Sequence, residues 1–255
     1  MIYSYGTLGW YYTKANRQYD NTGNQCALHH FVTDDVPDFQ VIINATLASA
    51  TYIMYDMDDV SIKAGSCVVN PLTNAAGTVY SQIILTGATT TGEDDGKYYF
   101  KVTPNAGNPI YSDVFCWETD VSDYLKVSAV VSVASIMIGH LPLAAFTYET
   151  YLKTVPFAEE YELSEVGVEK PYGDVTASAS SNIIRKFQIS GYNKTLNFLS
   201  RLPVINVNNT VTITWKGEAM VVYDIMVENK SSNPDVYVIE LTCKQKDYLQ
   251  TYNTI

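Results

Sequence analysis

Residues 93–118 read EDDGKYYFKVTPNAGNPIYSDVFCWE, and this stretch is the most informative about the fold. Asp95-Gly96 predicts a tight turn, because glycine tolerates the positive φ that such turns require. Tyr98, Phe100 and Val102 then fall on one face of a strand, with Lys97, Lys101 and Thr103 on the other. A polar loop and a return strand, IYSDVFCWE, follow. The pattern predicts a β-hairpin that closes a sandwich-like unit, and it favours scaffolding or recognition over catalysis.

Strand signals precede this hairpin at intervals of about ten to fifteen residues, which is typical of a sandwich or barrel. The predicted strands are FQVIINATL (39–47), TYIMY (51–55), GSCVV (65–69) and VYSQIILTG (79–87). Gly, Asn and Pro clusters between them predict turns at Asn70-Pro71 and over 74–77. We therefore expect a first domain over residues 1–122, a β-sandwich of the fibronectin type III or immunoglobulin sort.

The segment DVSD (120–123) predicts the junction with a second domain over residues 123–255. That domain is expected to be mainly β, because its apolar runs are rich in β-branched residues. Its predicted strands lie in YLKVSAVVSVASIMIG (124–139), FTYETYL (146–152), VTITW (211–215), AMVVYDIMVE (219–228) and DVYVIELTCK (235–244), the last three as a meander. One short helix is expected over 192–202, where leucines recur every three residues between a glycine and a proline.

Residues 149–174 carry seven acidic residues against two lysines. The segment shows no clean period, so we expect a long acidic surface loop with turns at Pro156, Gly167 and over 171–173. Loops of this length inside a domain are more often functional than incidental. The predicted fold class is therefore all-β, with two β-sandwich-like modules, the second holding one short helix and this loop.

Composition limits the partners. The net charge of −11 would repel a phosphate backbone and an anionic membrane surface, so no direct nucleic-acid contact is expected. The N-terminus lacks the basic and apolar regions of a signal peptide. The longest apolar stretch, Val127 to Leu143, is broken by polar residues and a proline, so no membrane insertion is expected.

Four cysteines, Cys26, Cys67, Cys116 and Cys243, are widely scattered and form no CxxC pair. Each lies in or near an apolar run, where a thiol behaves as a small hydrophobic side chain. The spacing leaves Cys26–Cys116 or Cys67–Cys116 disulfides open, but reduced thiols and assembly in a cytoplasm are the favoured interpretation.

No group of residues in the sequence indicates a catalytic or metal-binding site. His29 and His30 are adjacent, so on a strand they point to opposite faces and could not share a metal without a bend; His140 is alone. The acidic clusters at 56–59 and 93–95 lack the EF-hand ligand order and are interpreted as solvated turns. No nucleophile elbow is present. We predict no catalytic, cofactor-binding or metal-binding residues, no cofactor and no enzymatic activity.

Aromatic residues gather at the N-terminus, where Trp10, Tyr11 and Tyr12 are consecutive. Such a group could stack on sugars, or it could be an aromatic arm that docks on a neighbouring molecule. The chain has 21 tyrosines in all, most of which we expect at half-buried strand positions.

Two hairpin segments, DGKYYFKV (95–102) and IYSDVFCW (110–117), carry a family resemblance together with the residues that follow them. The order of an acidic segment at 159–162, the strand IRKFQI (184–189), a short helix and a β meander resembles structural tail and neck proteins of crAss-like phages, which infect gut Bacteroidetes. The resemblance covers about the last two-thirds of the chain.

The resemblance implies a non-enzymatic virion subunit of the tail or neck, such as a tail hub or connector ring. It implies assembly in the bacterial host cytoplasm into a homo-oligomeric ring that bridges neighbouring rings, with other tail and neck proteins as partners. Which virion part it would be is left open. The alternative is a carbohydrate-binding or receptor-recognition β-sandwich protein, and a polysaccharide depolymerase comes third.

Overall fold

The computed structural model describes residues 2–4, 7–16, 29–32, 39–85, 95–131, 146–169, 175–192, 211–229 and 236–245. These residues form strands β1 to β17 and one short 3₁₀ turn, which confirms the predicted all-β class. The helix expected over 192–202 lies outside the described residues, except for Tyr192, which ends a strand. No helix among the described residues is long and apolar enough to cross a membrane.

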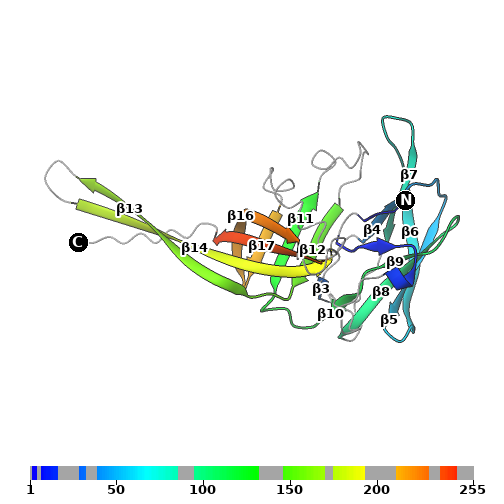
Figure 1. The fold of residues 1–255 in the computed structure, drawn as a ribbon, viewed down its shortest axis with the longest axis horizontal. Helices are drawn as coiled ribbons and strands as arrows, with labels where there is room; N and C mark the ends of the chain where they lie inside the picture. Colours follow the sequence, from blue (N-terminus) through cyan, green and yellow to red (C-terminus); the bar gives the residue numbers. More distant parts are fainter. Residues whose placement is uncertain are drawn as a thin grey trace.

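The N-terminal part comprises the elements up to Trp117 (Figure 1). They are β1 (Ile2–Ser4), β2 (Trp10–Tyr11), the 3₁₀ turn η1 (Lys14–Asn16), β3 (His29–Phe31), β4 (Gln40–Ile43), β5 (Ala50–Asp56), β6 (Ser61–Thr73), β7 (Val79–Leu85), β8 (Gly96–Pro104), β9 (Ile110–Ser112) and β10 (Phe115–Trp117).

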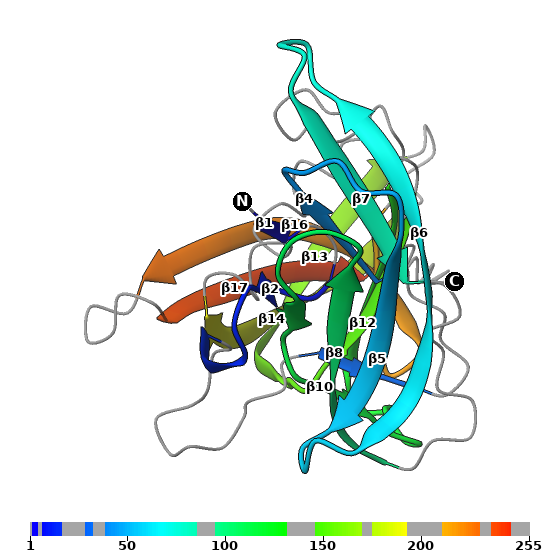
Figure 2. The same cartoon turned by 90° about the vertical axis from the view of Figure 1, so that its right-hand side faces the viewer.

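Strand β6 links two sets of strands in this part. Its residues up to Cys67 pair with β5, and its residues from Cys67 onward pair with β7. Beyond β5 the ladder continues to β8, while beyond β7 it continues to β4 and β1. Figure 2 shows β6 running alongside β5 at one end and β7 at the other. A strand that passes between two sheets in this way is a known means of building a sandwich corner.

The side chains between these two sets form an aromatic core. Phe115 is fully buried, and its ring centroid lies 4.9 Å from that of Phe100 and 5.7 Å from that of Phe39, both in stacked arrangements. The rest of the cluster includes aliphatic side chains from both sets, such as Val41 and Met54. Burial of apolar area on this scale is the main contribution to the stability of this part.

The β-hairpin predicted within residues 93–118 is confirmed, with one change. Tyr98, Phe100 and Val102 are buried on one face of β8, as their alternation predicts. The return strand is divided into β9 and β10, which pair with opposite ends of β8. The gap between them falls at Asp113, whose backbone N–H donates to the Gly9 carbonyl (2.8 Å) and whose Oδ2 accepts from the Gly9 N–H (2.8 Å). The break lets the N-terminal segment dock on the sheet.

Gly96 does not serve the purpose predicted for it. It is the first residue of β8, pairs with Trp117, and is not among the residues with positive φ. A Cβ at this position would lie 3.1 Å from the Tyr98 hydroxyl oxygen. The glycine therefore gives the Tyr98 side chain room rather than forming a turn.

Strand β4 is buried along its whole length. Val41 and Ile43 face the aromatic core, whereas Ile42 belongs to a second cluster formed mainly by the C-terminal part. On the same face as Ile42, the Gln82 amide donates to the Gln40 side-chain oxygen over 2.6 Å. Burial on both faces explains the near-continuous apolar run of this strand.

The described residues of the C-terminal part form seven strands. They are β11 (Leu125–Val131), β12 (Phe146–Leu152), β13 (Pro156–Glu169), β14 (Val175–Tyr192), β15 (Val211–Trp215), β16 (Glu218–Asn229) and β17 (Val236–Gln245). Antiparallel pairing runs in the order β12–β11–β15–β16–β17–β14–β13. The meander expected from 211 onward is confirmed, and Lys216 and Gly217 both adopt positive φ in its first turn.

One three-residue strand joins the two parts. β3 runs parallel to β10, with His30 opposite Cys116, and its other edge meets β12, with His30 opposite Tyr151. Through β3 the 17 described strands form a single hydrogen-bonded network. The two buried clusters draw mainly from opposite sides of residues 120–123, but a domain boundary between 122 and 123 stays a prediction.

The turn predicted at Asn70-Pro71 is wrong. Both residues lie inside β6, where Pro71 pairs with Ser81 of β7. A proline is tolerated there because this half of β6 pairs with β7 on one side only among the described strands, so no ladder hydrogen bond is lost on the other edge. The turn comes later, where Gly77 has positive φ and its N–H donates to the Asn74 carbonyl over 3.0 Å.

The acidic loop expected over 149–174 is also wrong. Its first residues end β12, and 156–169 form β13, one strand of the longest hairpin in the described chain. The predicted turn residues Pro156 and Gly167 lie within β13, and 171–173 lie outside the described residues. The strand period was hidden because the apolar alternation at Tyr161 and Leu163 changes phase before Val166 and Val168.

Gly65 of β6 makes a testable contribution to the first core. It lies opposite Tyr52, and a Cβ built on it would lie 2.6 Å from the atoms of the Tyr52 ring. We expect Gly65→Val to lower the free energy of unfolding by about 1–2 kcal/mol, since the buried ring must move. The neighbouring exposed Ala64→Val is the control and should change it by less than about 0.5 kcal/mol in urea unfolding. Equal effects of the two substitutions would contradict the packing described.

Candidate functional site

The β13–β14 hairpin extends away from the rest of the molecule as an arm (Figure 1). Near its root, β14 pairs with β17 over Ile184–Tyr192 as well as with β13. Farther out, residues 161–169 and 175–183 pair only with each other among the described strands. The outer arm is therefore a two-stranded ribbon whose outer edges carry no described strand.

The root of the arm is held by Arg185 of β14. Its Nε donates to Glu159 of β13 (3.1 Å), its Nη1 donates to Glu218 of β16 (2.6 Å), and its guanidinium carbon lies 5.1 Å from the centroid of the Trp215 ring. Burial lowers the pKa of Arg185, but the hydrogen bonds and charges of the two glutamates outweigh it and the pKa is raised. This side chain therefore ties three strands together as a permanent cation.

An open pocket of about 570 Å³ lies beside the root. It is lined by Asp123, Tyr124, Lys153, Thr154, Val155, Phe157 and Gln188. Phe157 is the unpaired residue at a register shift in β13, where Pro156 pairs with Phe187 and Ala158 with Lys186. Such a bulge redirects a side chain, and Phe157 is 55% exposed beside Val155, which is 67% exposed. The root therefore presents two apolar side chains to solvent.

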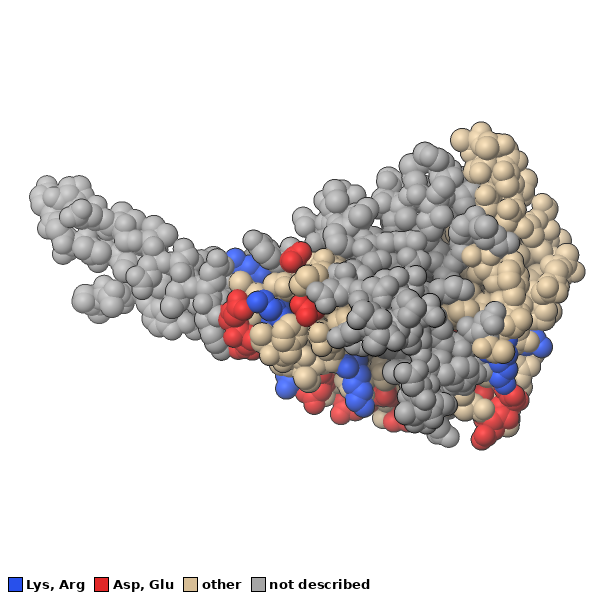
Figure 3. All heavy atoms as spheres, in the orientation of Figure 1, with Lys and Arg blue, Asp and Glu red and all other residues tan. Residues whose placement is uncertain are grey.

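The β6–β7 hairpin projects from the opposite end of the molecule (Figure 1). Residues 64–85 contain no Lys, Arg, His, Asp or Glu. In Figure 3 the surface over this hairpin shows no charged atoms, whereas charged side chains line the lower edge of the molecule. Val68 and Val79 are exposed on it. The two projecting hairpins thus differ in charge, because β13 alone carries five glutamates.

The aromatic group at the N-terminus is not a sugar-stacking platform or a free arm. Trp10 is 1% exposed and Tyr11 is 3% exposed, and both lie in β2, which pairs with β9 of the same chain. Only Tyr12 of the three is exposed. The prediction failed because a run of aromatic residues looks alike in the sequence whether it is docked on its own sheet or on a ligand.

The histidines occupy two different environments. His29 is fully buried, and its Nδ1 lies 3.0 Å from the Thr150 Oγ1. His30 points to the other side, as expected for neighbours on a strand, and its Nδ1 lies 2.8 Å from Glu118 Oε1. His140 lies outside the described residues. Sequence reasoning missed that Cys116 and Glu118 join His30, since Cys116 lies 86 positions after His30 in the chain.

The acidic cluster at 56–59 stabilises the turn between β5 and β6. Asp56 Oδ1 accepts from the N–H groups of Asp58 (2.9 Å) and Val60 (2.8 Å), which closes the β5–β6 turn. Asp59 accepts from the Tyr99 hydroxyl (2.5 Å) and pairs with Lys14. These contacts confirm the interpretation of 56–59 as a turn; of the second cluster, Glu93 and Asp94 lie outside the described residues.

Cys67, Cys116 and Cys243 form no disulfide in the described part of the chain, and reduced thiols stay a prediction. Burial raises the pKa of Cys67 and of Cys243 to about 12. Thiols of this kind stay protonated near neutral pH and are poor nucleophiles. Cys26, which one alternative disulfide requires, lies outside the described residues.

No protein-family model, no curated protein and no solved structure matches this chain. Its function is therefore inferred from the shape, charge and pairing of its own strands.

Proposed function

We propose that the chain is a non-enzymatic structural subunit of a phage virion, in the tail or neck, which assembles as a homo-oligomeric ring and bridges neighbouring rings. The observation that carries the proposal is the outer β13–β14 arm, whose residues pair only with each other. A two-stranded ribbon is at best marginally stable in water by itself. The arm gains its missing packing when its faces and open edges meet a neighbour.

A second copy of the chain is the neighbour that fits. The arm and the uncharged β6–β7 hairpin project from opposite ends of the molecule, so contact between them is head-to-tail, the geometry that generates rings. The acidic β13 meets no like charge on residues 64–85 of the next copy. Exposed Val155 and Phe157 at the root add apolar area to the contact.

The sequence supports the virion assignment. The hairpin and the residues that follow it resemble tail and neck proteins of crAss-like phages, and the net charge of −11 disfavours direct contact with DNA. The alternative, a glycan-binding protein, loses its main motivation because Trp10 and Tyr11 are buried.

Shortening the arm tests the proposal. Glu160 pairs with Ile184, so residues 161–183 can be replaced by Asn-Gly, which closes the hairpin with a tight turn and leaves the β14–β17 ladder intact. We expect the full chain to form a ring and the shortened chain to be monomeric in size-exclusion chromatography with light scattering. A matching midpoint of thermal unfolding would show that the body of the shortened chain still folds.

Unchanged assembly of the shortened chain would contradict the role given to the arm. The virion assignment is tested separately by mass spectrometry of purified particles, in which this protein should be present in multiple copies. Its absence from purified particles would refute the virion assignment whatever the behaviour of the isolated protein.

A further inference from the structure

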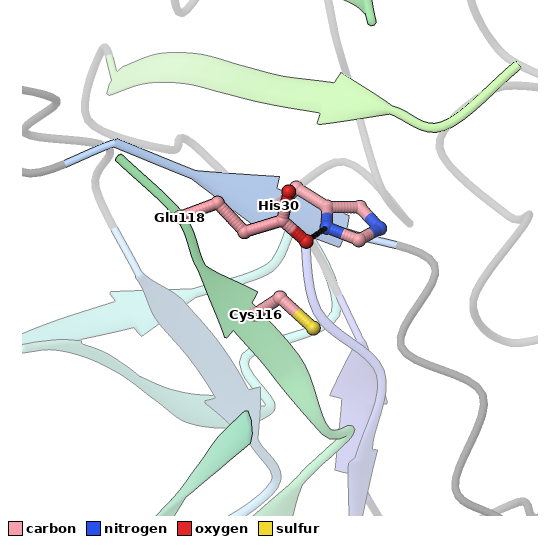
Figure 4. A group of neighbouring side chains, drawn as sticks. All are labelled: His30, Cys116 and Glu118. Carbon is pink, nitrogen blue, oxygen red and sulfur yellow. Dashed lines mark hydrogen bonds and ion pairs between the residues drawn. The ribbon is translucent and has the colours of Figure 1, made fainter. Parts of the chain in front are cut away.

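Three potential metal ligands, one from β3, one from β10 and one from the residue that follows β10, meet beside the junction of the two parts. One ligand atom from each of His30, Cys116 and Glu118 lies within 4.8 Å of the other two (Figure 4). The register explains the meeting: His30 pairs with Cys116 across the parallel β3–β10 ladder. Glu118 lies two residues beyond Cys116, and its N–H donates to the Phe31 carbonyl over 3.0 Å. Residues two apart along a strand share a face.

The cluster is largely shielded from water but keeps an exposed side. The side chains of His30 and Glu118 are 7% and 23% exposed, and Cys116 is buried. His30 Nδ1 lies 2.8 Å from Glu118 Oε1. Exposure at Glu118 leaves room for a solvent molecule or a further ligand to enter from that side.

Tyr124 orients the carboxylate. Its hydroxyl donates to Glu118 Oε2, and its ring packs edge-on against the His30 imidazole at a centroid distance of 5.0 Å. Ligating carboxylates are held by outer hydrogen bonds of this kind. Tyr124 also lines the pocket beside the root of the arm, so this pocket lies next to the cluster.

We propose that His30, Cys116 and Glu118 bind a divalent transition metal ion, with zinc as the preferred ion. An imidazole nitrogen, a thiolate and a carboxylate are the three ligand types that zinc takes in proteins. At zinc–ligand distances of about 2.0–2.3 Å, the ligand atoms of a tetrahedral site lie roughly 3.3–3.8 Å apart. The His30 and Glu118 atoms would separate by about half an ångström from their hydrogen-bonded distance, which a rotation of the carboxylate provides. Metal binding removes the proton from the Cys116 thiol.

A metal at this position would fasten the strand that joins the two parts. β3 is held by its ladders to β10 and β12 and has only three residues. Ligands from β3 and from the end of β10 would cross-link that ladder, and any metal that binds only the folded chain stabilises it.

The test uses the full chain, treated with EDTA and kept reduced with a phosphine. We expect it to take up one equivalent of Zn²⁺ in competition with a chromophoric chelator. Co²⁺ should give the near-ultraviolet band of sulfur-to-cobalt charge transfer. Cys116→Ser should abolish that band, and His30→Gln should weaken Zn²⁺ affinity by at least about tenfold. Cys67→Ser, at a thiol outside any such cluster of described residues, is the matched control and should retain both properties.

Tyr124→Phe removes no ligand and keeps the ring, so it should fold and weaken affinity by about 10–100-fold. Far-ultraviolet circular dichroism checks each variant. Failure of the full chain to take up either ion would overturn the proposal. Persistence of the cobalt band in Cys116→Ser, which would place the metal elsewhere in the chain, would also overturn it.

Discussion

Phe115→Ala is expected to lower the free energy of unfolding by about 3–5 kcal/mol, the cost of deleting a fully buried ring from a packed core. Phe115 is 0% exposed and stacks on Phe39 and Phe100, and its ring also meets Trp117 edge-on at a centroid distance of 5.9 Å. Because Phe39 and Phe100 come from two other segments and Trp117 lies on the same strand as Phe115, no single neighbour can move to fill the space. The loss of apolar burial therefore adds to the cost of the cavity.

Equilibrium unfolding in urea, followed by tryptophan fluorescence, measures the effect. Phe157→Ala makes the same chemical change at a side chain that is 55% exposed, and it should alter stability by less than about 0.5 kcal/mol. A loss below about 1 kcal/mol for Phe115→Ala would mean that the core around it is not packed as described.

Arg185→Ala is expected to lower the free energy of unfolding by about 2–3 kcal/mol. Removing one partner of a fully buried ion pair costs about 3–5 kcal/mol. Here Glu159 and Glu218 are 35% and 42% exposed, so water partly solvates them once the arginine is gone and the cost is reduced. The substitution also removes the guanidinium from the face of Trp215.

Two variants separate the sources of this effect. Arg185→Lys keeps the charge but loses the fork that reaches two carboxylates, so it should recover only part of the loss. Lys186→Ala breaks the neighbouring pair with Glu160, whose side chain is 56% exposed, and should cost less than about 1 kcal/mol. Equal losses at positions 185 and 186 would contradict the special role of Arg185.

Much of the strand content could be predicted, because local alternation decides it. On one face of β8 only Tyr99 is buried, whereas Tyr98, Phe100 and Val102 recur at every second position and are all buried on the other face. Ile239 and Leu241 of β17 do the same in the second core. In these segments the period of two coincides with burial of one face, so the sequence pattern and the packing agree.

Prediction failed where burial depends on distant segments. Trp10 is exposed or buried according to whether β9 lies beside it, and nothing near Trp10 in the sequence shows this. A proline usually ends a strand, but Pro71 is tolerated in β6 because this half of the strand pairs with a described strand on one edge only. The acidic segment forms β13 because β14 pairs with it, although its own alternation changes phase.

The candidate metal cluster could not be predicted for the same reason. His30 and Cys116 are far apart in the chain and become neighbours only when β3 and β10 pair in parallel. Metal motifs that are recognisable in sequences have closely spaced ligands, and here only Cys116 and Glu118 are close. The arm root is similar, since Glu218 lies 33 residues beyond Arg185.

The position of β3 also has a consequence for synthesis of the chain. His29 meets Thr150 across 121 residues of sequence. Ribosomes add about 5–20 residues per second, so β3 waits roughly 6–24 seconds after its own synthesis before its partner on β12 exists. The N-terminal strands can pair during that interval, and β3 can join β10, but the second edge of β3 has no partner until β12 exists. The junction between the two parts is therefore completed only when a segment synthesised late meets one synthesised early.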